Sequence, residues 1–250
     1  MDIQTLFGLD GKVALVTGGA TGIGRMAAEA LMRAGATALI ASRKGDACEA
    51  VAKELNALGA SGKAIGFAGD VGTEAGVDAL VAAVHAHTDR LDILMNNAGI
   101  TWGAPLGDFP FKAWEKVMNV NVAGMFDLTQ KLLPMLRASG SVDDPARVIN
   151  VGSVMGEREM GDGAYSYSMS KAAVHHMTRI LGKELAGEAI TVNALAPGPF
   201  VSRMTAFATH DEDTRSKVGK DVPLKRVGRD EDIGGCMLFL CGRGGAYVTG

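Results

Sequence analysis

Short, almost continuously apolar runs alternate along this chain with longer segments in which apolar residues recur at helical spacing. Runs rich in Val, Ile and Ala are typical of strands buried on both faces of a parallel sheet. The predicted strands span residues 12–17, 37–42, 63–68, 91–95, 147–151 and 190–195. The predicted helices span about 22–34, 45–58, 74–87, 111–137, 165–186 and 230–240.

The strict alternation of strand and helix predicts an α/β fold, a Rossmann-type doubly wound parallel sheet with helices on both faces. A chain of 250 residues without an internal repeat, a linker or a low-complexity stretch suits one domain, which we expect to span 1–250. The polar segment from about 199 to 221 is predicted to form a mobile, helix-containing lid over the substrate.

A glycine-rich loop, Thr17-Gly-Gly-Ala-Thr-Gly-Ile-Gly24, follows the first strand and opens the first helix. Glycines let the backbone turn tightly and approach a pyrophosphate, whose charge is then stabilised by the N-terminus of the helix. The alternative is a glycine-rich turn without a ligand, because the chain holds 34 glycines. The cofactor ligands predicted in this loop are Gly18, Thr21, Gly22, Ile23 and Gly24.

The second strand ends at Ser42, which is followed by Arg43 and Lys44. NAD-dependent enzymes usually place an acidic residue here on the ribose 2′-hydroxyl, and a carboxylate would repel a 2′-phosphate. A serine followed by two cations would instead attract that phosphate. The charges therefore favour NADP(H), with Ser42 and Arg43 as ligands, over the alternative of a solvated pair of loop cations.

Two further segments follow the carboxyl ends of predicted strands, where ligands bind in open α/β sheets. Asp70 and Val71 come after the third strand and are expected to meet the adenine. After the fourth strand comes Asn96-Asn97-Ala98-Gly99, whose last three residues are expected to line the nicotinamide half of the cofactor.

Ser153, Tyr167 and Lys171 form the candidate catalytic set. Residues at i and i+4 share a helix face, so Lys171 is expected near the Tyr167 phenol. A free tyrosine titrates at about pH 10, and a neighbouring ammonium lowers that pKa toward the pH at which acid–base catalysis works best. Ser153 would hold the reacting oxygen by a hydrogen bond. The alternative for the Tyr–Lys pair is an ordinary surface contact on a helix.

The overall composition excludes several other classes of protein. A net charge of −3 and the absence of basic runs give no footprint for nucleic acid. The chain shows neither a signal peptide nor an apolar run long enough for a membrane span. Three cysteines without a C-x-x-C pair fit a cytoplasmic setting. The pairs His85/His87 and His175/His176 are interpreted as helix-surface residues, and no metal site is expected.

In order and spacing, these motifs resemble the short-chain dehydrogenase/reductase family over nearly the whole chain. The resemblance adds Asn121, Pro197 and Gly198, and implies that Tyr167 is the general acid/base and that Ser153 orients the substrate oxygen. It implies that Lys171 lowers the pKa of Tyr167 and holds the nicotinamide ribose, that Asn121 anchors a water of a proton relay, and that Pro197 and Gly198 contact the cofactor. Tyr165 is the less suitable tyrosine, because Met169 stands four residues after it.

Within the family, the chain is most similar to NADPH-dependent 3-oxoacyl reductases, including the rhamnolipid-associated kind. This likeness lies in residues 96–106 and 202–205. Two features differ. Reductases that act on acyl carrier protein have an arginine where this chain has Glu188, which would repel an acidic carrier. The family also continues beyond Tyr247-Val-Thr-Gly250 into a seventh strand, which this sequence does not include.

The substrate pocket is expected between residues 155–163 and 199–221. Apolar side chains there could line a cleft for an acyl chain or merely pack the lid onto the domain: Trp102, Met155, Met160, Phe200 and Met204. Cations of this region could meet a phosphate or carrier, or be solvated: Arg203, Lys217, Lys220, Lys225 and Arg226.

The helices predicted over 111–137 and 165–186 carry more apolar and small residues than one buried face requires, which suggests packing between subunits. The residues expected in that contact are Ala172, Ala173, Met177 and Leu181, against Val122, Met125 and Leu132. The family resemblance implies a homodimer or homotetramer through these helices.

Three functions are compatible with the sequence. The first is an NADP(H)-dependent reductase of a ketone, or dehydrogenase of a secondary alcohol, with a 3-oxoacyl thioester among the candidate substrates. The second is an NAD(H)-dependent polyol or alcohol dehydrogenase. The third is a non-catalytic nucleotide-binding regulator, which would not need all of Asn121, Ser153, Tyr167 and Lys171.

Overall fold

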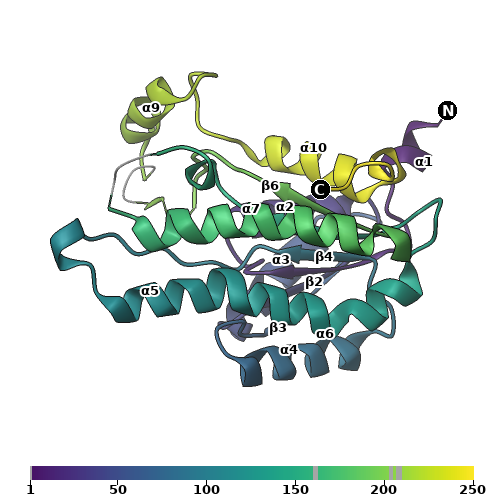
Figure 1. The fold of residues 1–250 in the computed structure, drawn as a ribbon. Coiled ribbons are helices and arrows are strands. Elements are labelled where there is room, and N and C mark those ends of the chain that lie inside the picture. The colour runs from purple at the N-terminus through teal and green to yellow at the C-terminus, as the bar shows by residue number, and fades with distance from the viewer. Residues whose placement is uncertain (1, 160–162, 203–204, 207–209) are drawn as a thin grey trace.

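The computed structural model describes residues 2–159, 163–202, 205–206 and 210–250. Within these residues, six parallel strands form one sheet in the order β3-β2-β1-β4-β5-β6 (Figure 1). The strands are β1 Val13–Thr17, β2 Thr37–Ser42, β3 Lys63–Ala68, β4 Ile93–Asn96, β5 Ala146–Val151 and β6 Ile190–Leu195. The strand order reverses between β1 and β4, so this is the switch point at which such sheets bind ligands. The predicted doubly wound sheet is confirmed.

The helices lie close to their predicted ranges, apart from a short N-terminal helix, α1, that was not predicted. They are α1 Ile3–Phe7, α2 Gly22–Arg33, α3 Gly45–Asn56, α4 Glu74–His87, α5 Phe111–Met118, α6 Gly124–Ser139, α7 Tyr165–Leu185, α9 Glu212–Asp221 and α10 Asp230–Cys241. In Figure 1, α5, α6 and α7 lie on one side of the sheet, whereas α9 stands away from it. Every helix of the described part is too short or too polar to cross a bilayer.

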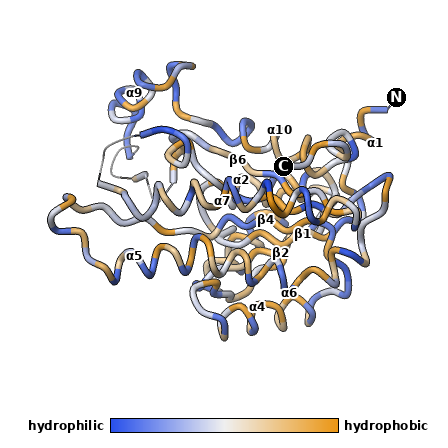
Figure 2. Tube along the Cα trace, viewed as in Figure 1, coloured by the Kyte–Doolittle hydropathy of each residue, from blue (hydrophilic) through white to orange (hydrophobic). Residues whose placement is uncertain are grey.

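Each face of the sheet has its own apolar core, because successive strand residues point to opposite faces. In β1, Ala14 and Val16 pack with α2, α3 and α10, whereas Leu15 packs with α4, α6 and α7. In β2, Ile40 belongs to the same core as Ala14 and Val16, and Leu39 belongs to the same core as Leu15. Figure 2 shows the consequence: the strands are predominantly apolar, and strongly hydrophilic residues gather on outlying segments such as α9.

The long helix predicted over 111–137 is interrupted, and this is a correction. Residues Asn119–Ala123 form a π-helical turn between α5 and α6, and the Gly124 amide donates to the Asn119 carbonyl five residues earlier. Such a turn inserts one residue into the helix and is frequent at functional sites. The helix also passes very close to the loop after β3, since a Cβ at Gly124 would lie 1.7 Å from the Val71 carbonyl oxygen.

Three of the residues predicted to pack between subunits are buried within this chain, which is a second correction. Leu132 and Leu181 belong to the apolar core that covers one face of the sheet, and Met125 is 3% exposed, so these three are not available to a partner. The other four are half-buried, and their place in a subunit contact stays a prediction: Val122, Ala172, Ala173 and Met177.

Besides Tyr165, the large apolar side chains exposed on α6 and α7 are Phe126, Met169 and Ile180.

The last residues of the sequence run beside β6. The Gly250 amide donates to the Val192 carbonyl over 2.8 Å, and Asn193 Nδ2 donates to the Val248 carbonyl over 2.8 Å. Among the described residues no seventh strand follows β6.

Candidate active site

Ser153 and Tyr167 meet at the carboxyl edge of the sheet. Ser153 lies two residues after the end of β5 and caps a 3-10 turn, Val154–Gly156, whereas Tyr167 lies in the first turn of α7. The Ser153 hydroxyl lies close enough to the Tyr167 phenol to favour its ionised form. The other candidate, Tyr165, is instead 36% exposed and packs edge-on against Phe109, with ring centroids 5.6 Å apart.

Lys171 lies beside this pair in an almost completely buried position. Its side chain is 3% exposed, and Nζ donates to the Val151 carbonyl over 2.6 Å. The ammonium nitrogen is 5.6 Å from the centroid of the Tyr167 ring. Burial disfavours the charged form and lowers the pKa of Lys171 to about 8.

The pKa of Tyr167 departs from the expectation. Burial raises the pKa of this phenol above its ordinary value, and the hydrogen bond from Ser153 only partly opposes that effect. The predicted lowering by Lys171 is therefore wrong for the protein without its cofactor. The physical reason is that desolvation of the phenolate outweighs the available stabilisation, while Lys171 Nζ is engaged with the Val151 carbonyl.

Asn121 is fully buried in the π-helical turn, close to Lys171. Its Oδ1 accepts from the Ile100 amide over 2.9 Å, and its Nδ2 donates to the Ile100 carbonyl and to Ser170 Oγ, each over 2.9 Å. A Cβ at Gly99 would lie 3.3 Å from Asn121 Oδ1 and 3.6 Å from Lys171 Nζ. The loop after β4 therefore passes between the two side chains.

The prediction that His175 lies on the helix surface is wrong, because the residue is 6% exposed. The Ser153 backbone amide donates to its Nε2 over 3.3 Å. His176 and the pair His85/His87 are exposed, as expected. The burial of His175 was not predictable from the sequence, because helical periodicity does not reveal which loop packs over a helix.

The glycine loop is held against the loop after β4. Thr17 Oγ1 accepts from the amides of Asn97 and Ala98, each over 3.0 Å, and Asn97 Nδ2 donates to the carbonyls of Thr17 and Gly18. Gly18 and Gly22 have φ of +66° and +53°, a region that favours glycine. Within α2, a Cβ at Gly24 would lie 2.5 Å from Asn97 Nδ2, so the helix start needs glycine there as well.

The N-terminus of α2 has the features of an anion site. Its N-cap, Thr21, makes no side-chain cap hydrogen bond, and its first turn holds no acidic residue. At α4, by contrast, Thr73 caps the Gly76 amide and Glu74 occupies the first turn. The first amides of α2 are thus left for a negatively charged group, which the positive end of the helix dipole would stabilise. Ile23 packs partly against the core.

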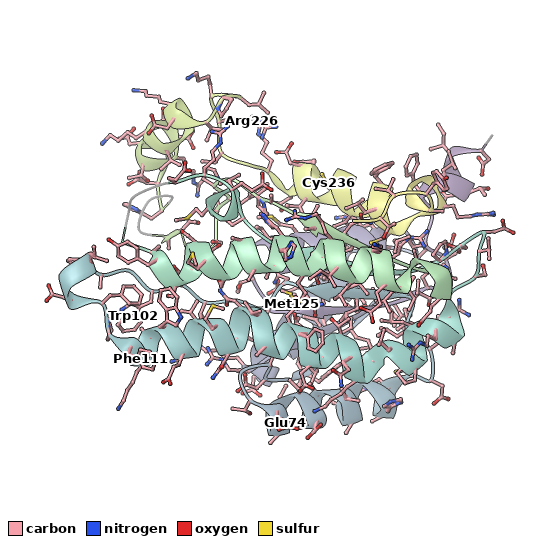
Figure 3. The ribbon with its side chains drawn as sticks, in the orientation of Figure 1. Glu74, Trp102, Phe111, Met125, Arg226 and Cys236 are labelled. Carbon is pink, nitrogen blue, oxygen red and sulfur yellow. The ribbon has the colours of Figure 1, made fainter. Side chains whose placement is uncertain are left out.

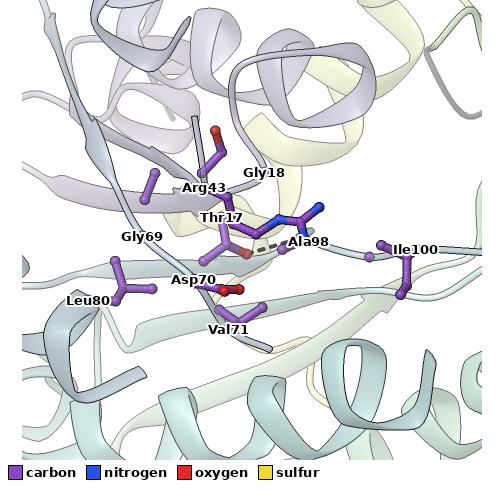
Figure 4. A pocket seen from close by; sticks show the side chains of 12 residues that line it. Thr17, Gly18, Arg43, Gly69, Asp70, Val71, Leu80, Ala98 and Ile100 are labelled. Carbon is purple, nitrogen blue, oxygen red and sulfur yellow. Dashed lines mark hydrogen bonds between the residues drawn. The ribbon is translucent and has the colours of Figure 1, made fainter. Parts of the chain in front are cut away.

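A cavity of about 150 Å³ continues from the glycine loop along the carboxyl ends of β1, β2 and β3 (Figure 4). In the figure, Arg43 reaches across the cavity toward Ala98, with Asp70 and Val71 on the opposite wall. The Ser42 hydroxyl contacts Lys44 and Cys48 Sγ, the latter at 3.0 Å. The residues lining the cavity are Thr17, Gly18, Ala41, Ser42, Arg43, Gly69, Asp70, Val71, Leu80, Ala98, Gly99 and Ile100.

Pro197 and Gly198 flank the other side of Ser153. The Pro197 carbonyl accepts from the Val154 amide over 3.1 Å. A Cβ at Gly198 would meet no described atom within 4 Å, so this glycine borders open space. Ser202 lies over the glycine loop, since a Cβ at Gly22 would be 2.9 Å from Ser202 Cβ. The segment after β6 therefore approaches the start of α2.

The apolar side chains predicted for a substrate cleft differ in their burial and packing. Phe200 packs against the core, and its ring occupies the space that a Cβ at Gly228 would need. Trp102 is 47% exposed near the start of α5 (Figure 3), and Met155 is half-buried in the turn after Ser153. Met160 and Met204 lie outside the described residues, as does Arg203.

Two predicted surface charges have partners within the chain. Arg226 forms an ion pair with Asp232 at the start of α10 (Figure 3), with Nη2 2.8 Å from Oδ1. Glu188, which follows α7, accepts from Arg137 Nη2 over 3.0 Å. Lys225 Nζ donates to the Lys220 carbonyl. Glu188 and Arg226 are therefore already compensated.

The comparisons with known proteins agree with this geometry. A family model described as short chain dehydrogenase matches residues 12–213. A rhamnolipids biosynthesis 3-oxoacyl-[acyl-carrier-protein] reductase of Pseudomonas aeruginosa is 46% identical over 98% of this chain and 94% of its own. The 3-oxoacyl-[acyl-carrier-protein] reductase FabG of Aquifex aeolicus is 37% identical over 97% of this chain and 94% of its own.

A solved structure shows the same likeness. The Pseudomonas aeruginosa RhlG/NADP active-site complex superposes with a TM-score of 0.93 at 46% identity, and the match covers 98% of this chain and 94% of that one. Sequence and structure thus lead to one conclusion: the chain belongs to the short-chain dehydrogenase/reductase family.

Proposed function

We propose that this protein is an NADP(H)-dependent oxidoreductase that interconverts a ketone and a secondary alcohol. The observation that carries the proposal is the closeness of the Ser153 and Tyr167 hydroxyls to each other and to the buried Lys171, at the same sheet edge as the cavity of Figure 4. The similarity to 3-oxoacyl-[acyl-carrier-protein] reductases supports it. The assignment of roles to individual residues is our inference from their geometry and from the family.

The chain's own residues supply acid–base chemistry and orientation. In the direction of reduction, Tyr167 donates its phenolic proton to the carbonyl oxygen, and Ser153 holds that oxygen by a hydrogen bond as charge develops on it. NADPH, when bound, supplies the hydride that the carbonyl carbon accepts. The high pKa of the buried phenol keeps Tyr167 protonated before the reaction, as an acid requires.

Lys171 and Asn121 support the return of a proton to Tyr167. With a pKa of about 8, Lys171 can lose and regain a proton near physiological pH. We assign it the nicotinamide ribose as a ligand, following the family. Asn121 is held in place by hydrogen bonds with Ile100 and Ser170. A water bound to Asn121 would complete the proposed proton relay from Tyr167 through Lys171.

The residues of the pocket fit a dinucleotide that carries a 2′-phosphate. The uncapped start of α2 is suited to the pyrophosphate, and the predicted ligands Gly18, Thr21, Gly22, Ile23 and Gly24 surround it. Arg43 is exposed and lines the cavity beside Ser42, where an NAD-dependent enzyme would place an acid. The other proposed ligands are Asp70, Val71, Asn97, Ala98, Gly99, Tyr167, Lys171, Pro197 and Gly198.

We infer that the substrate is a small carbonyl compound or alcohol, and that 3-oxoacyl thioesters are the first class to examine. Residues 199–221 are proposed to act as a lid over it, within one domain that spans 1–250. The Arg137–Glu188 ion pair leaves no unpaired arginine at that point of the described surface for an acidic carrier.

We propose a homodimer or homotetramer that is located in the cytoplasm. The exposed Phe126, Met169 and Ile180 would lie in a subunit contact made by α6 and α7. The cysteines Cys48, Cys236 and Cys241 are all free, which suits a reducing compartment. Light scattering on the purified protein tests the oligomer, and an alanine at Phe126 should weaken it.

The experiment that tests the function follows the oxidation of the reduced nicotinamide at 340 nm. Purified protein is given NADPH or NADH with 3-oxoacyl thioesters, diketones and cyclic ketones. Turnover that is faster with NADPH than with NADH supports the proposal. A preference for NAD(H) with polyols would support the alternative dehydrogenase, and tight NADPH binding without turnover on any ketone would support a non-catalytic regulator.

A further inference from the structure

The imidazole of His175 lies directly behind the loop that carries Ser153. It follows Lys171 by one turn of α7, and only 6% of it is exposed. Its Nε2 accepts the hydrogen of the Ser153 backbone amide, with 3.3 Å between the two nitrogens. The ring therefore contacts the same residue whose hydroxyl lies beside the Tyr167 phenol.

Gly152 allows the loop to close over this ring. A Cβ at Gly152 would lie 2.0 Å from His175 Nε2 and 2.4 Å from its Cδ2, too close for a real Cβ, so a larger residue would push the loop away from the ring. A Cβ at Gly156 would lie 3.0 Å from His175 Cε1, but its closest contacts would be with the backbone of α7, at 2.8 Å from the Lys171 carbonyl carbon and 2.9 Å from the Ala172 nitrogen. The residue before Ser153 is thus fitted to the shape of the imidazole.

The hydrogen bond also determines where the proton of a neutral imidazole must be. Because Nε2 accepts, the proton belongs on Nδ1. This nitrogen lies 3.3 Å from Glu157 Oε1 but makes no hydrogen bond with any residue that the structure describes. The charged groups that face the ring are Glu157 from the loop and Lys171 and Arg179 from α7.

We propose that His175 is a positioning residue, whose neutral Nδ1–H imidazole holds the Ser153 backbone so that the hydroxyl stays directed at Tyr167. This inference rests on the proposed function only in so far as Ser153 acts on a carbonyl oxygen. A protonated ring has N–H on both nitrogens and can no longer accept from the Ser153 amide. Protonation of His175 should therefore release the loop and slow turnover without altering cofactor binding.

Replacement of the acceptor separates positioning from packing. Leucine at position 175 fills a similar volume but accepts no hydrogen bond, so H175L should lower kcat about tenfold, since small displacements of a catalytic group are costly. Glutamine places an amide oxygen where Nε2 was, so H175Q should keep kcat within about threefold of the wild type. NADPH affinity, measured by fluorescence titration, should be unchanged in both variants.

The exposed neighbour on the same helix provides a matched control. His176 is exposed, and the one hydrogen bond described for its ring is with Arg179, at 3.5 Å. H176L and H176Q should both retain the wild-type kcat. Equal losses in the His175 and His176 variants would overturn the proposal, because they would indicate a general effect on α7.

The pH profile gives a second readout. Burial lowers the pKa of His175 below its ordinary value, although Glu157 opposes this effect and Lys171 and Arg179 add to it. The acid limb of kcat in the wild type should therefore lie at a lower pH than the titration of a free histidine, and H175Q should lack this limb, because its amide does not titrate. An identical acid limb in the wild type and in H175Q contradicts the proposal.

Nitrogen NMR of the wild-type protein gives a readout that needs no activity. The ¹⁵N shifts of the His175 ring at pH 7.5 should be those of the Nδ1–H tautomer, the less common form of free imidazole. An Nε2–H tautomer would overturn the proposal even if H175L failed to fold. If the wild type turned over no ketone, the proposed function would fail, while the tautomer would still decide whether His175 accepts from Ser153.

Discussion

Buried charged side chains have different surroundings at the two edges of the sheet. At the amino ends of β1, β4 and β5, Asp92 and Arg147 are 2% and 1% exposed, and each has several partners. At the carboxyl ends, the buried Lys171 donates to a main-chain carbonyl and has no ion pair with any residue that the structure describes. Both edges desolvate charged side chains, but within the described residues the amino edge alone compensates them with charges of opposite sign.

The amino edge is a closed network. Asp92 accepts from both Arg90 Nε and Nη2, at 2.8 and 2.7 Å, and Lys12 Nζ bridges Asp92 and Asp144 at 3.4 and 2.6 Å. Arg147 donates to the carbonyls of Leu240 and Gly242 over 3.1 and 3.0 Å, which joins β5 to the end of α10. Loss of one member would leave buried partners without compensation.

The carboxyl edge is an open network, and its pKa values are displaced as a result. Burial raises the pKa of Tyr167 and lowers the pKa of Lys171 to about 8. Each group therefore favours its neutral form more than it would in water. The amino edge thus compensates its buried charges, whereas the carboxyl edge holds the groups that we propose for proton transfer.

The comparison is tested most strongly by removing the Tyr167 hydroxyl. Tyr167→Phe should reduce kcat by about 10²–10⁴-fold, because general acid–base catalysis contributes that much. NADPH affinity and the free energy of unfolding should change little, since the ring still packs. Steady-state kinetics, fluorescence titration and urea unfolding measure the three quantities. Unchanged turnover would show that the carboxyl edge does not act through this phenol.

At the amino edge the expected effect is on stability. Arg147→Leu should lower the free energy of unfolding by about 3–5 kcal/mol, because it leaves buried carbonyls without donors and removes a partner of Asp144. Arg137→Leu is the control: its side chain is 48% exposed and that of its partner Glu188 is 37% exposed, so the loss should be at most about 1 kcal/mol. Urea unfolding compares the two. Equal effects would contradict the distinction between buried and exposed ion pairs.

At neutral pH, the buried Lys171 should lower the free energy of unfolding, whereas Arg147 should raise it. Its pKa is about 8 in the folded protein and about 10.4 in the unfolded chain. Between these values the unfolded chain holds the extra proton, so raising the pH favours folding, by up to about 3 kcal/mol. Urea unfolding of the cofactor-free protein from pH 7 to pH 10.5 should show this gain, and Lys171→Met should lack it. Parallel curves for the two proteins would refute the prediction.

A smaller effect should distinguish the two cofactors. Arg43→Ala should weaken NADPH binding about tenfold, as expected for one charge-assisted contact to the 2′-phosphate, and leave NADH binding unchanged. Lys53→Ala, in α3, is a control for loss of a nearby cation, since it does not line the cavity. Fluorescence titration measures both affinities. An equal loss for NADPH and NADH would show that Arg43 does not contact the 2′-phosphate.

Most of the fold was predictable because the strands carry their periodicity locally. The range predicted for α4 agrees with the structure at both ends, and most others differ by a few residues. The π-helical turn at Asn121 was not predictable, because it depends on how closely Gly124 approaches Val71. The burial of Leu132 and Leu181 within the chain was also not predicted, since an apolar helix face does not show whether its own chain or a partner covers it.

The order and spacing of the motifs established the family, the doubly wound sheet and the list of candidate ligands, because local turns and helix faces follow from neighbouring residues. The pKa direction of Tyr167, the burial of His175 and the network around Arg147 depended on contacts between residues far apart in the chain. Desolvation arises only when separate segments exclude water together. The sequence therefore identified the candidate reactive side chains, whereas their burial and the direction of their pKa shifts depended on the folded structure.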